Sequence, residues 1–381
     1  MIYKQFQDMP LSALGYGCMR FPTVDGDVAA VNEEEAAKLI ARAMEGGVNY
    51  YDTAWGYHGG NSEAVMGRIL KGYPRDSFYL ADKFPGYDLS NMDKVEEIFD
   101  KQLEKCQVEY FDFYLFHNVC EMNIAAYLDP KYHIYDSLVA RKKAGQIKHL
   151  GFSAHGNLDT MRRFLEAYGK DMEFCQIQLN WLDWEFQDAR AKVELLDSWG
   201  IPVWVMEPLR GGKLAKLSEE DAAKLREPRP GEGVPAWAFR FIQSLHSVGV
   251  TLSGMSTMDQ VEDNLRTFSE EKPLSSQEAE ALLSIAREMT RRTSIPCTAC
   301  RYCPPHCPQG LDIPNLLELY NEYSFTGGGF IAPMRVGQLP AEKKPSACVG
   351  CRSCEAVCPQ QIKISEALAD FSSKLGLRET V

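Results

Sequence analysis

Short runs of β-branched and aromatic residues alternate along the chain with longer segments in which apolar residues recur at helical spacing. The longer segments predict amphipathic helices, for example over Glu34–Met44, Met92–Cys106 and Ala189–Trp199. The short runs predict eight strands, near Leu14–Cys18, Val48–Asp52, Phe78–Lys83, Asp112–His117, Ile147–Ser153, Phe174–Asn180, Pro202–Glu207 and Val250–Met255. Eight strand-and-helix units in about 270 residues predict an α/β fold, a (β/α)8 TIM barrel. An open doubly wound sheet is the alternative, but no G-x-G-x-x-G follows the first strand.

Polar residues stand at or just beyond the ends of successive predicted strands. One such residue would mean little, because strand ends need polar groups, but six occur in succession: Asp52, Lys83, His117, Ser153, Asn180 and Glu207. Barrel enzymes gather their chemistry at the carboxyl ends of the strands. We therefore expect these side chains to face a common site.

Two cysteine runs near the C-terminus share the pattern C-x2-C-x2-C-x3-C-P, namely Cys297, Cys300, Cys303 and Cys307, then Cys348, Cys351, Cys354 and Cys358. This spacing is typical of bacterial ferredoxins and predicts two [4Fe-4S] clusters. Zinc is the first alternative, but zinc ligands usually come as two pairs separated by a loop. Disulfides are the second, but the N-terminus shows no apolar segment of a secretory signal.

Composition limits the classes of function. The chain has 381 residues, more than one typical domain, and a formal net charge of −12. The acidic balance argues against a nucleic-acid partner, and no run of eighteen apolar residues is present to span a membrane. The sequence therefore predicts a cytoplasmic enzyme of more than one domain, with neither nucleic acid nor membrane as a partner.

The strand-end residues carry a specific resemblance. In NYYDTAWGY, Asp52 is followed five positions later by Tyr57; LADK ends in Lys83 and DFYLFH ends in His117. In order and spacing these four resemble the tetrad of the aldo/keto reductase family, and the resemblance covers about residues 10 to 270. It implies a barrel oxidoreductase that reduces a carbonyl, or oxidises the alcohol, with NAD(P)H.

The same four residues can be interpreted chemically. A carbonyl that accepts hydride needs a proton donor, and a phenol with a pKa of about 10 gives up its proton reluctantly unless a cation lies beside it. Lys83 would lower the pKa of Tyr57, and Asp52 would keep Lys83 charged and oriented. His117 would bind the substrate oxygen or share the proton. The alternative is that the Asp52 and Lys83 pair only satisfies the barrel rim.

The resemblance also implies a cofactor site, with departures from the family pattern. Ser153 and Gln176 match residues that hold the nicotinamide amide, whereas Ala154 replaces the usual asparagine and Met206 stands where an aromatic ring usually stacks. The cofactor contacts implied by the resemblance are completed by Asn180, by Pro208, Leu209, Gly211, Gly212 and Leu214 of PLRGGKL around the pyrophosphate, and by Gly254, Ser256, Thr257, Gln260, Asp263 and Asn264 of SGMSTMDQVEDN around the adenosine. Gly254 and Gln260 replace the Lys and Arg that grip a 2′-phosphate in many relatives, so the choice between NAD and NADP stays open.

Loops over the predicted barrel mouth carry several aromatic and basic side chains. The aromatic side chains indicate a planar or apolar substrate, with packing at the barrel rim as the alternative role: Trp55, His58, Trp181 and Trp184. His155 and Arg210 are candidates for binding an anionic group. The segment Asn118–Tyr135 is expected to cover the mouth.

The C-terminal part predicts a second domain. Ser276–Arg292 reads as a long amphipathic helix leading into the first cysteine run. We expect a barrel over residues 1–285 and a mostly α-helical ferredoxin-type domain over 286–381, because the spacer Pro308–Ala347 is long and predicts a helix at Ile313–Tyr323, followed by the loop SFTGGGFIAP. Since the fourth cysteine of a run ligates the other cluster, we expect Cys297, Cys300 and Cys303 to share a cluster with Cys358, and Cys348, Cys351 and Cys354 to share one with Cys307.

Joining the two domains leaves three interpretations. Nicotinamide transfers electrons in pairs as hydride, whereas a cubane transfers them singly. In the first, a hydride-transferring reductase of small carbonyls or alcohols carries clusters for docking, sensing or structure. In the second, the altered pocket holds a flavin or reacts by one-electron steps that the clusters feed. In the third, the barrel has lost its chemistry and the chain is an electron-transfer subunit that serves a redox partner protein.

Overall fold

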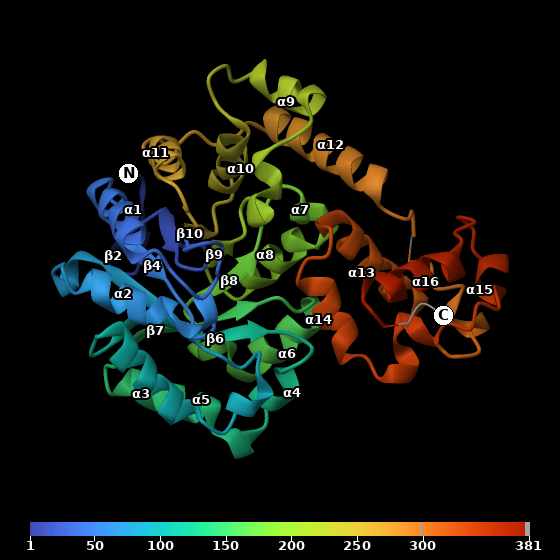
Figure 1. Ribbon diagram of the computed structural model, residues 1–381, viewed down its shortest axis with the longest axis horizontal. Helices are drawn as coiled ribbons and strands as arrows, with labels where there is room; N and C mark the ends of the chain where they lie inside the picture. The colour runs from blue at the N-terminus through green and yellow to red at the C-terminus, as the bar shows by residue number, and fades with distance from the viewer. Residues whose placement is uncertain (298, 378–381) are drawn as a thin grey trace. The chain divides into compact units, whose positions relative to one another are not determined.

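The chain forms two compact units, Met1–Leu283 and Ser284–Val381, in a computed structural model that describes residues 1–297 and 299–377 (Figure 1). The sequence places its domain boundary near residue 285, close to this division. Among the described residues, no helix combines the length and the apolar character needed to cross a membrane.

Eight parallel strands close into a barrel in the first unit, as predicted. Their order around the barrel is β10-β3-β4-β5-β6-β7-β8-β9, so each neighbours the next strand in the chain. Their bounds are β3 Leu14–Gly17, β4 Tyr50–Asp52, β5 Tyr79–Phe84, β6 Phe111–Val119, β7 Ile147–Ala154, β8 Cys175–Gln178, β9 Val203–Met206 and β10 Val248–Ser253. Each lies at or within a few residues of a predicted run.

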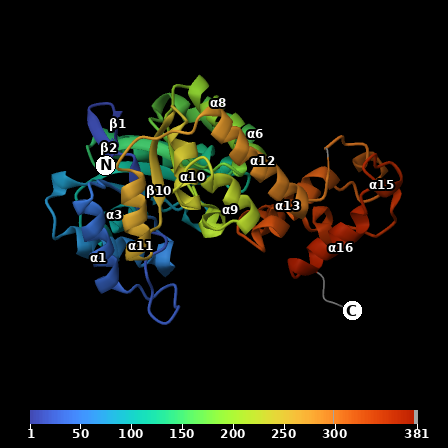
Figure 2. The same ribbon diagram turned by 90° about the horizontal axis from the view of Figure 1, so that it is seen from above.

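Helices surround this barrel on its outside (Figures 1 and 2). A typical one, α1, is preceded by the cap residue Asn32, whose side chain accepts a hydrogen bond from the backbone N–H of Glu35 and satisfies a free donor of the first turn. The helices are α1 Glu33–Glu45, α2 Ser62–Leu70, α3 Val95–Cys106, α4 Ile124–Tyr127, α5 Ile134–Lys143, α6 Leu158–Tyr168, α7 Asp183–Phe186, α8 Ala189–Ser198, α9 Glu219–Arg226, α10 Val234–Gln243, α11 Met258–Thr267 and α12 Ser276–Thr293.

An antiparallel hairpin, β1 Tyr3–Phe6 and β2 Met9–Ser12, precedes the barrel and was not predicted. Phe6 packs edge-on against Trp204 at 5.1 Å between ring centroids and lies 5.7 Å from Phe113. These rings belong to one buried apolar cluster with residues from most barrel strands. Because Phe113 and Trp204 lie near the starts of β6 and β9, the hairpin closes the amino-terminal end of the barrel.

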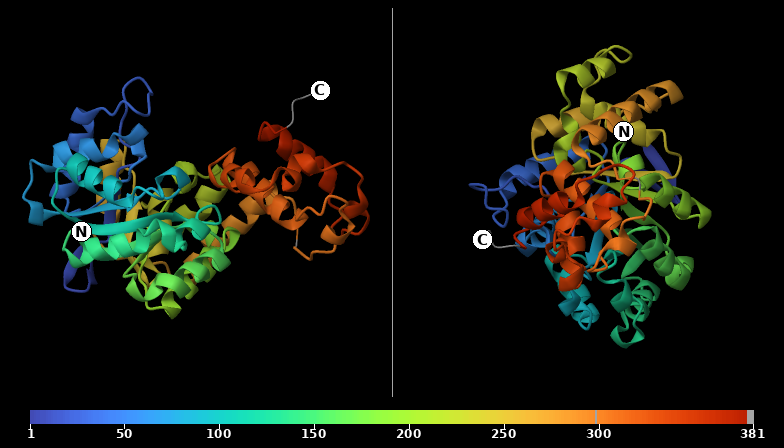
Figure 3. Two further views of the ribbon diagram at one scale, coloured as in Figure 1. Left: turned by 90° about the horizontal axis from the view of Figure 1, so that it is seen from below. Right: turned by 90° about the vertical axis from the view of Figure 1, so that its right-hand side faces the viewer.

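The second unit contains helices joined by loops, and no strand occurs among its described residues (Figure 3). Its helices are α13 Ile313–Thr326, α14 Ile331–Gln338, α15 Ser353–Ala356 and α16 Ile364–Lys374. The side chains of Leu316, Leu317, Ile364 and Leu368 join α13 to α16 in a core that also contains Cys303 and Cys354. The predicted loop SFTGGGFIAP is only partly a loop, because α13 continues to Thr326 and α14 begins at Ile331. Gly327 ends α13 in the left-handed conformation that glycine adopts without strain.

Candidate active site and cluster sites

A buried ion pair joins the ends of two neighbouring strands. Asp52 ends β4, and Lys83 lies near the end of β5, whose Ala81 is the register partner of Asp52. The ammonium of Lys83 donates to Oδ1 of Asp52 at 2.6 Å and to the carbonyl of Thr53 at 2.7 Å. The exposed fractions of the Lys83 and Asp52 side chains are 0% and 2%. A charge so completely removed from water is retained only with a partner, so each ion fixes the position of the other.

Two further members of the predicted tetrad lie beside this pair. Tyr57 begins the short 3-10 helix Tyr57–Gly60 that follows β4, and Nζ of Lys83 lies 5.1 Å from the centroid of its ring. The His117 ring, near the end of β6, lies edge-on to Tyr57 at 6.2 Å and to Tyr87 at 5.2 Å between centroids. His117 Nδ1 is buried and has no hydrogen-bond partner among the described residues. The structure therefore brings together all four side chains that the sequence singled out.

Burial sets the protonation of these groups. It raises the pKa of Tyr57 to about 12, although the neighbouring Lys83 ammonium acts in the opposite direction. Burial also pulls the pKa of Lys83 down, but the charges of Asp52 and Tyr57 outweigh it and leave the pKa above its ordinary value. Burial, with the Lys83 charge, holds the pKa of His117 well below its ordinary value. At neutral pH the site thus holds a protonated phenol, an ammonium and a neutral imidazole.

Three residues predicted to hold nicotinamide lie on the neighbouring strands β7, β8 and β9. Ser153 Oγ accepts a hydrogen bond from the backbone N–H of Asn118 at 2.8 Å. The amide nitrogen of Gln176 lies 3.8 Å from the sulfur of Met206, while its Oε1 is buried without a partner among the described residues. A buried acceptor without a donor is unusual in a protein, and an amide donor on a ligand would satisfy it. These residues fit a nicotinamide carboxamide.

Asn180 and Arg210 are held in place by hydrogen bonds and an ion pair within the protein. Asn180 donates to Asp183 and to the carbonyl of Glu207, and its Oδ1 accepts backbone N–H groups at the start of α7. Arg210, which the sequence offered to an anionic substrate, forms an ion pair with Asp183 at 3.0 Å, and their exposed fractions are 2% and 0%. Arg210 thus neutralises a buried carboxylate, and the cofactor contact of Asn180 stays a prediction.

The loops after β9 and β10 expose backbone where the sequence predicts contacts with the pyrophosphate and with the adenosine, respectively. Gly211 and Gly212 lie in the 3-10 segment Arg210–Ala215 with φ of 66° and 92°, values that favour glycine. A Cβ placed on Gly212 would meet nothing within 4 Å. After β10, Thr257 caps α11 by accepting the N–H of Gln260, and Asn264 donates to Ser253. Pro208, Leu209, Leu214, Gly254, Ser256 and Asp263 lie in or beside these loops, and their cofactor contacts stay predictions.

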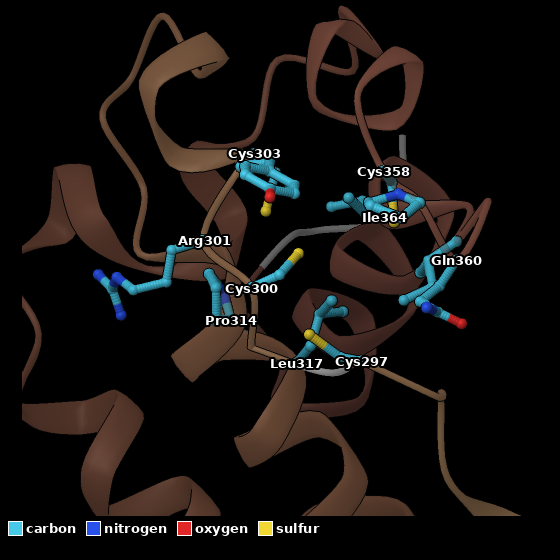
Figure 4. A pocket seen from close by; sticks show the side chains of 12 residues that line it. Cys297, Cys300, Arg301, Cys303, Pro314, Leu317, Cys358, Gln360 and Ile364 are labelled. Atoms are coloured by element: carbon cyan, nitrogen blue, oxygen red, sulfur yellow. The ribbon is translucent and has the colours of Figure 1, made fainter.

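Eight cysteines surround two hollows in the second unit. Cys297, Cys300, Cys303 and Cys358 line one of them, with apolar Pro314, Leu317, Ile362 and Ile364 (Figure 4). Cys307, Cys348, Cys351 and Cys354 line the other. Four thiols in an apolar surround fit an iron–sulfur cluster. Each hollow combines three cysteines of one run with the fourth of the other, the grouping predicted from the sequence; ligation itself stays a prediction.

A model of the aldo/keto reductase family matches residues 13–287. The chain belongs to the aldo/keto reductase family. A model of the 4Fe-4S dicluster domain matches residues 296–362, so this family member carries a ferredoxin-type domain after its barrel. The sequence-based identification of both parts is thereby confirmed, as is the assignment to the oxidoreductases.

Individual relatives are distant. The chain is 26% identical over 217 residues to "Probable aldo-keto reductase 1" of Glycine max, a match that covers 54% of this chain but only 58% of that relative. It is 26% identical over 234 residues to the "NADH-specific methylglyoxal reductase" of Escherichia coli, covering 56% and 68%. An aldo-keto reductase of Klebsiella pneumoniae, solved in complex with NADPH, has a TM-score of 0.60 at 17% identity, with 75% of this chain and 96% of that one covered. At this identity the structural likeness shows the fold alone.

The structure also places one residue that sequence reasoning passed over. Arg20, in the loop after β3, lies next to Gly211 of the predicted pyrophosphate loop and Gly254 of the predicted adenosine loop. No motif marks it, because its neighbours come from positions 211 and 254, far along the chain. Its strand, β3, pairs with β10 in the closed barrel, and only barrel closure brings the loops after these two strands together.

Proposed function

We propose that this aldo/keto reductase family member reduces a small carbonyl compound, or oxidises the corresponding alcohol, with NAD(P)H. One observation carries the proposal: a completely buried Lys83 ammonium bonded to Asp52 at 2.6 Å lies 5.1 Å from the ring of Tyr57. This arrangement stabilises a phenolate as it forms, which is what proton donation by a tyrosine requires.

Each residue of the tetrad has its own role in the proposed reduction of the carbonyl. Tyr57 holds the proton that the oxygen of the reacting carbonyl receives, since its pKa of about 12 keeps the phenol protonated near neutral pH. Lys83 supplies positive charge beside the phenol, and Asp52 keeps that charge in place. His117, neutral and with Nδ1 free of partners among the described residues, supports a hydrogen bond to the substrate oxygen. Bound NAD(P)H supplies the hydride.

The nicotinamide would be held by Ser153, Gln176 and Met206, the pyrophosphate by the loop after β9, and the adenosine by the loop after β10. The unsatisfied Oε1 of Gln176 and the open backbone at Gly212 support this placement. The Escherichia coli relative is named as NADH-specific, and the Klebsiella neighbour was solved with NADPH. The proposed cofactor is therefore a nicotinamide dinucleotide, and the choice between NADH and NADPH is left to experiment.

We also propose that the eight cysteines hold two [4Fe-4S] clusters, one in each hollow. The three-plus-one grouping around both hollows supports this ligand set. A cubane there would exchange single electrons with a redox partner protein, respond to oxidants, or stabilise a unit whose apolar core includes Cys303 and Cys354.

The experiment that tests the catalytic proposal is Tyr57→Phe, assayed by anaerobic reduction of carbonyl compounds with NADPH and NADH. We expect kcat to fall by roughly 100-fold or more, the usual scale for removing a positioned general acid, while nucleotide affinity stays unchanged. Tyr73→Phe, outside the site, serves as the matched control. A Tyr57→Phe protein that keeps the rate of the wild type would overturn the proposal and favour a chain whose barrel is not catalytic.

A further inference from the structure

The loop that carries Tyr57 joins β4 to α2, and one side chain of the neighbouring helix α3 contacts it. Nζ of Lys105 lies 4.0 Å from the centroid of the Trp55 ring. The same atom donates a hydrogen bond to the carbonyl of Gly60 at 3.2 Å. Trp55 stands two positions before Tyr57 and Gly60 three positions after it, so one ammonium contacts the loop on both sides of the proposed proton donor.

This loop depends on outside contacts to keep a single conformation. Gly59 and Gly60 have φ of 62° and 91°, in the left-handed region that glycine adopts without strain. Glycine also loses the most conformational freedom when a loop becomes ordered. Within the loop, His58 is held because its Nε2 accepts the backbone N–H of Phe21 at 3.1 Å. The ammonium of Lys105 supplies a further attachment, from α3.

A buried carboxylate fixes the position of this ammonium. Nζ of Lys105 lies 2.7 Å from Oε2 of Glu63, in the first turn of α2, and the exposed fractions of the two side chains are 30% and 0%. The other oxygen of Glu63 accepts a hydrogen bond at 3.0 Å from the amide of Gln102, which also donates to the carbonyl of Lys83 at 3.0 Å. A carboxylate removed from water needs a cation and hydrogen-bond donors, so Glu63 keeps Lys105 in place.

The packing of α2 on α3 is made by the backbones of the two helices. Gly67 of α2 lies so close to α3 that a Cβ placed on it would be 2.3 Å from the carbonyl oxygen of Lys105 and 2.9 Å from that of Cys106. The contacts with the loop, by contrast, are made by the ammonium at the end of the Lys105 side chain. A substitution can therefore remove the loop contacts while the contact between the helices stays.

We propose that Lys105 is a positioning residue for Tyr57, an inference that rests on the proposed function. Its ammonium attaches the residues on both sides of Tyr57 to α3. The phenol is thereby kept beside Lys83, whose Nζ lies 5.1 Å from the centroid of the ring. A misplacement of about 1 Å in a reacting group can lower a rate by about 100-fold. Lys105 therefore acts on turnover through the position of Tyr57.

The test measures anaerobic carbonyl reduction and nucleotide binding for full-length variants with clusters intact. Lys105→Met keeps an unbranched side chain and removes the ammonium. We expect it to lower kcat by about tenfold and to leave the affinities for NADPH and NADH unchanged. Lys105→Arg keeps a cation and should recover most of the rate. Lys101→Met is the matched control on the same helix, because the ion pair of Lys101 with Glu97 is exposed, and it should behave as the wild type does.

A double-mutant cycle separates the positioning of Tyr57 from a general loss of structure. In the Tyr57→Phe background, Lys105→Met should cause little further fall in rate, because the group that Lys105 positions is already gone. An equal fall in both backgrounds would overturn the inference. Lys105→Met leaves Glu63 without its cation, so a variant that fails to fold is replaced by Glu63→Gln with Lys105→Met. This double variant removes both charges, and the same results are expected of it.

The outcomes distinguish this inference from the proposed function. An inactive Tyr57→Phe together with a fully active Lys105→Met overturns the inference and leaves the function intact. A Lys105→Met variant that loses nucleotide affinity and keeps kcat also overturns the inference, because the residue would then serve binding instead of proton donation. A Tyr57→Phe variant with the rate of the wild type overturns the proposed function, and the inference with it.

Discussion

Lys83 donates a hydrogen bond of 2.6 Å to Asp52 in a place from which water is almost completely excluded. Removing one partner from such a pair leaves the other charge buried and unpaired, which costs about 3 to 5 kcal/mol. The same pair holds the positive charge beside Tyr57, so its effects on stability and on turnover can be separated by mutation.

Asp52→Asn should destabilise the barrel by about 3 kcal/mol and lower kcat by at least tenfold. The double variant Asp52→Asn, Lys83→Met should regain much of the stability and none of the activity, because it removes both charges. Urea unfolding followed by tryptophan fluorescence measures the barrel alone, since all six tryptophans lie within residues 1–283. A single variant as stable as the wild type would contradict the importance of this pair.

The pH profile of carbonyl reduction should be nearly flat from about pH 6 to about pH 9. Tyr57 has its pKa raised to about 12 and therefore stays protonated throughout this range. His117 has its pKa held well below the ordinary value and therefore stays neutral. Measuring kcat and kcat/KM at saturating nucleotide checks this. A fall in rate between about pH 7 and about pH 9 would show that the acid is a group with a much lower pKa.

Glu173 should stabilise the barrel in a pH-dependent way. It accepts hydrogen bonds from His149, Lys142 and Gln7, and against the opposing effect of burial these bonds lower its pKa from 4.5 to about 2. The folded pKa lies below the unfolded one, so the stabilisation is complete above about pH 4.5 and is lost as the pH falls toward 2. Glu173→Gln should cost roughly 1 to 3 kcal/mol at neutral pH.

The difference between Glu173→Gln and wild type should shrink as the pH is lowered through the acid range, measured by tryptophan-monitored unfolding. Glu166→Gln, an exposed glutamate on α6, is the matched control and should change little. A destabilisation that is the same at all pH values would assign the effect of Glu173 to packing instead of charge.

Pairs of cysteine substitutions should reveal which cysteines ligate which cluster. Cys300→Ser with Cys358→Ser removes two residues of one hollow and should cost one cluster, about half of the bound iron. Cys300→Ser with Cys307→Ser affects both hollows and should cost both clusters. Anaerobic iron and sulfide analysis distinguishes the two, and Cys175→Ala in the barrel is the control. The opposite ranking would mean that each run ligates its own cluster.

Adding NADPH or NADH alone should leave the visible absorbance of the clusters unchanged. Hydride carries two electrons and a cubane accepts one, so direct reduction needs an intermediate carrier. Anaerobic spectra recorded before and after addition, with carbonyl reduction measured in the same sample, check this. Rapid bleaching by either nucleotide would show that the barrel and the clusters are electronically coupled.

The barrel and its tetrad were predictable because both follow local patterns. The eight apolar runs give the strands, and Asp52, Lys83 and His117 stand where those runs end. The hairpin of β1 and β2 was missed because its strands are only four residues long and Pro10 interrupts the second. Such short strands show little alternation of apolar and polar residues. The start of α14 at Ile331 was missed. Three glycines in succession favour a loop, and the predicted loop was therefore extended into the first residues of the helix.

Roles that depend on distant partners were not predictable. Arg210 looked available for an anion, yet Asp183, twenty-seven positions away, neutralises it inside the protein. Arg20 attracted no notice, yet it extends to two glycines that are each nearly two hundred residues or more away in the chain. The raised pKa of Tyr57 likewise reflects burial, which the residue types around it do not reveal.

The closure of one end of the barrel by Phe6 has a kinetic consequence. With that end filled by rings from β6 and β9, the nucleotide and the substrate have to enter and leave through the opposite opening. We expect a nicotinamide held by Ser153, Gln176 and Met206, on β7, β8 and β9, to lie deeper than a substrate that reaches His117 and Tyr57 from outside. Binding should then follow a fixed sequence, in which the dinucleotide arrives before the carbonyl compound and departs after the alcohol.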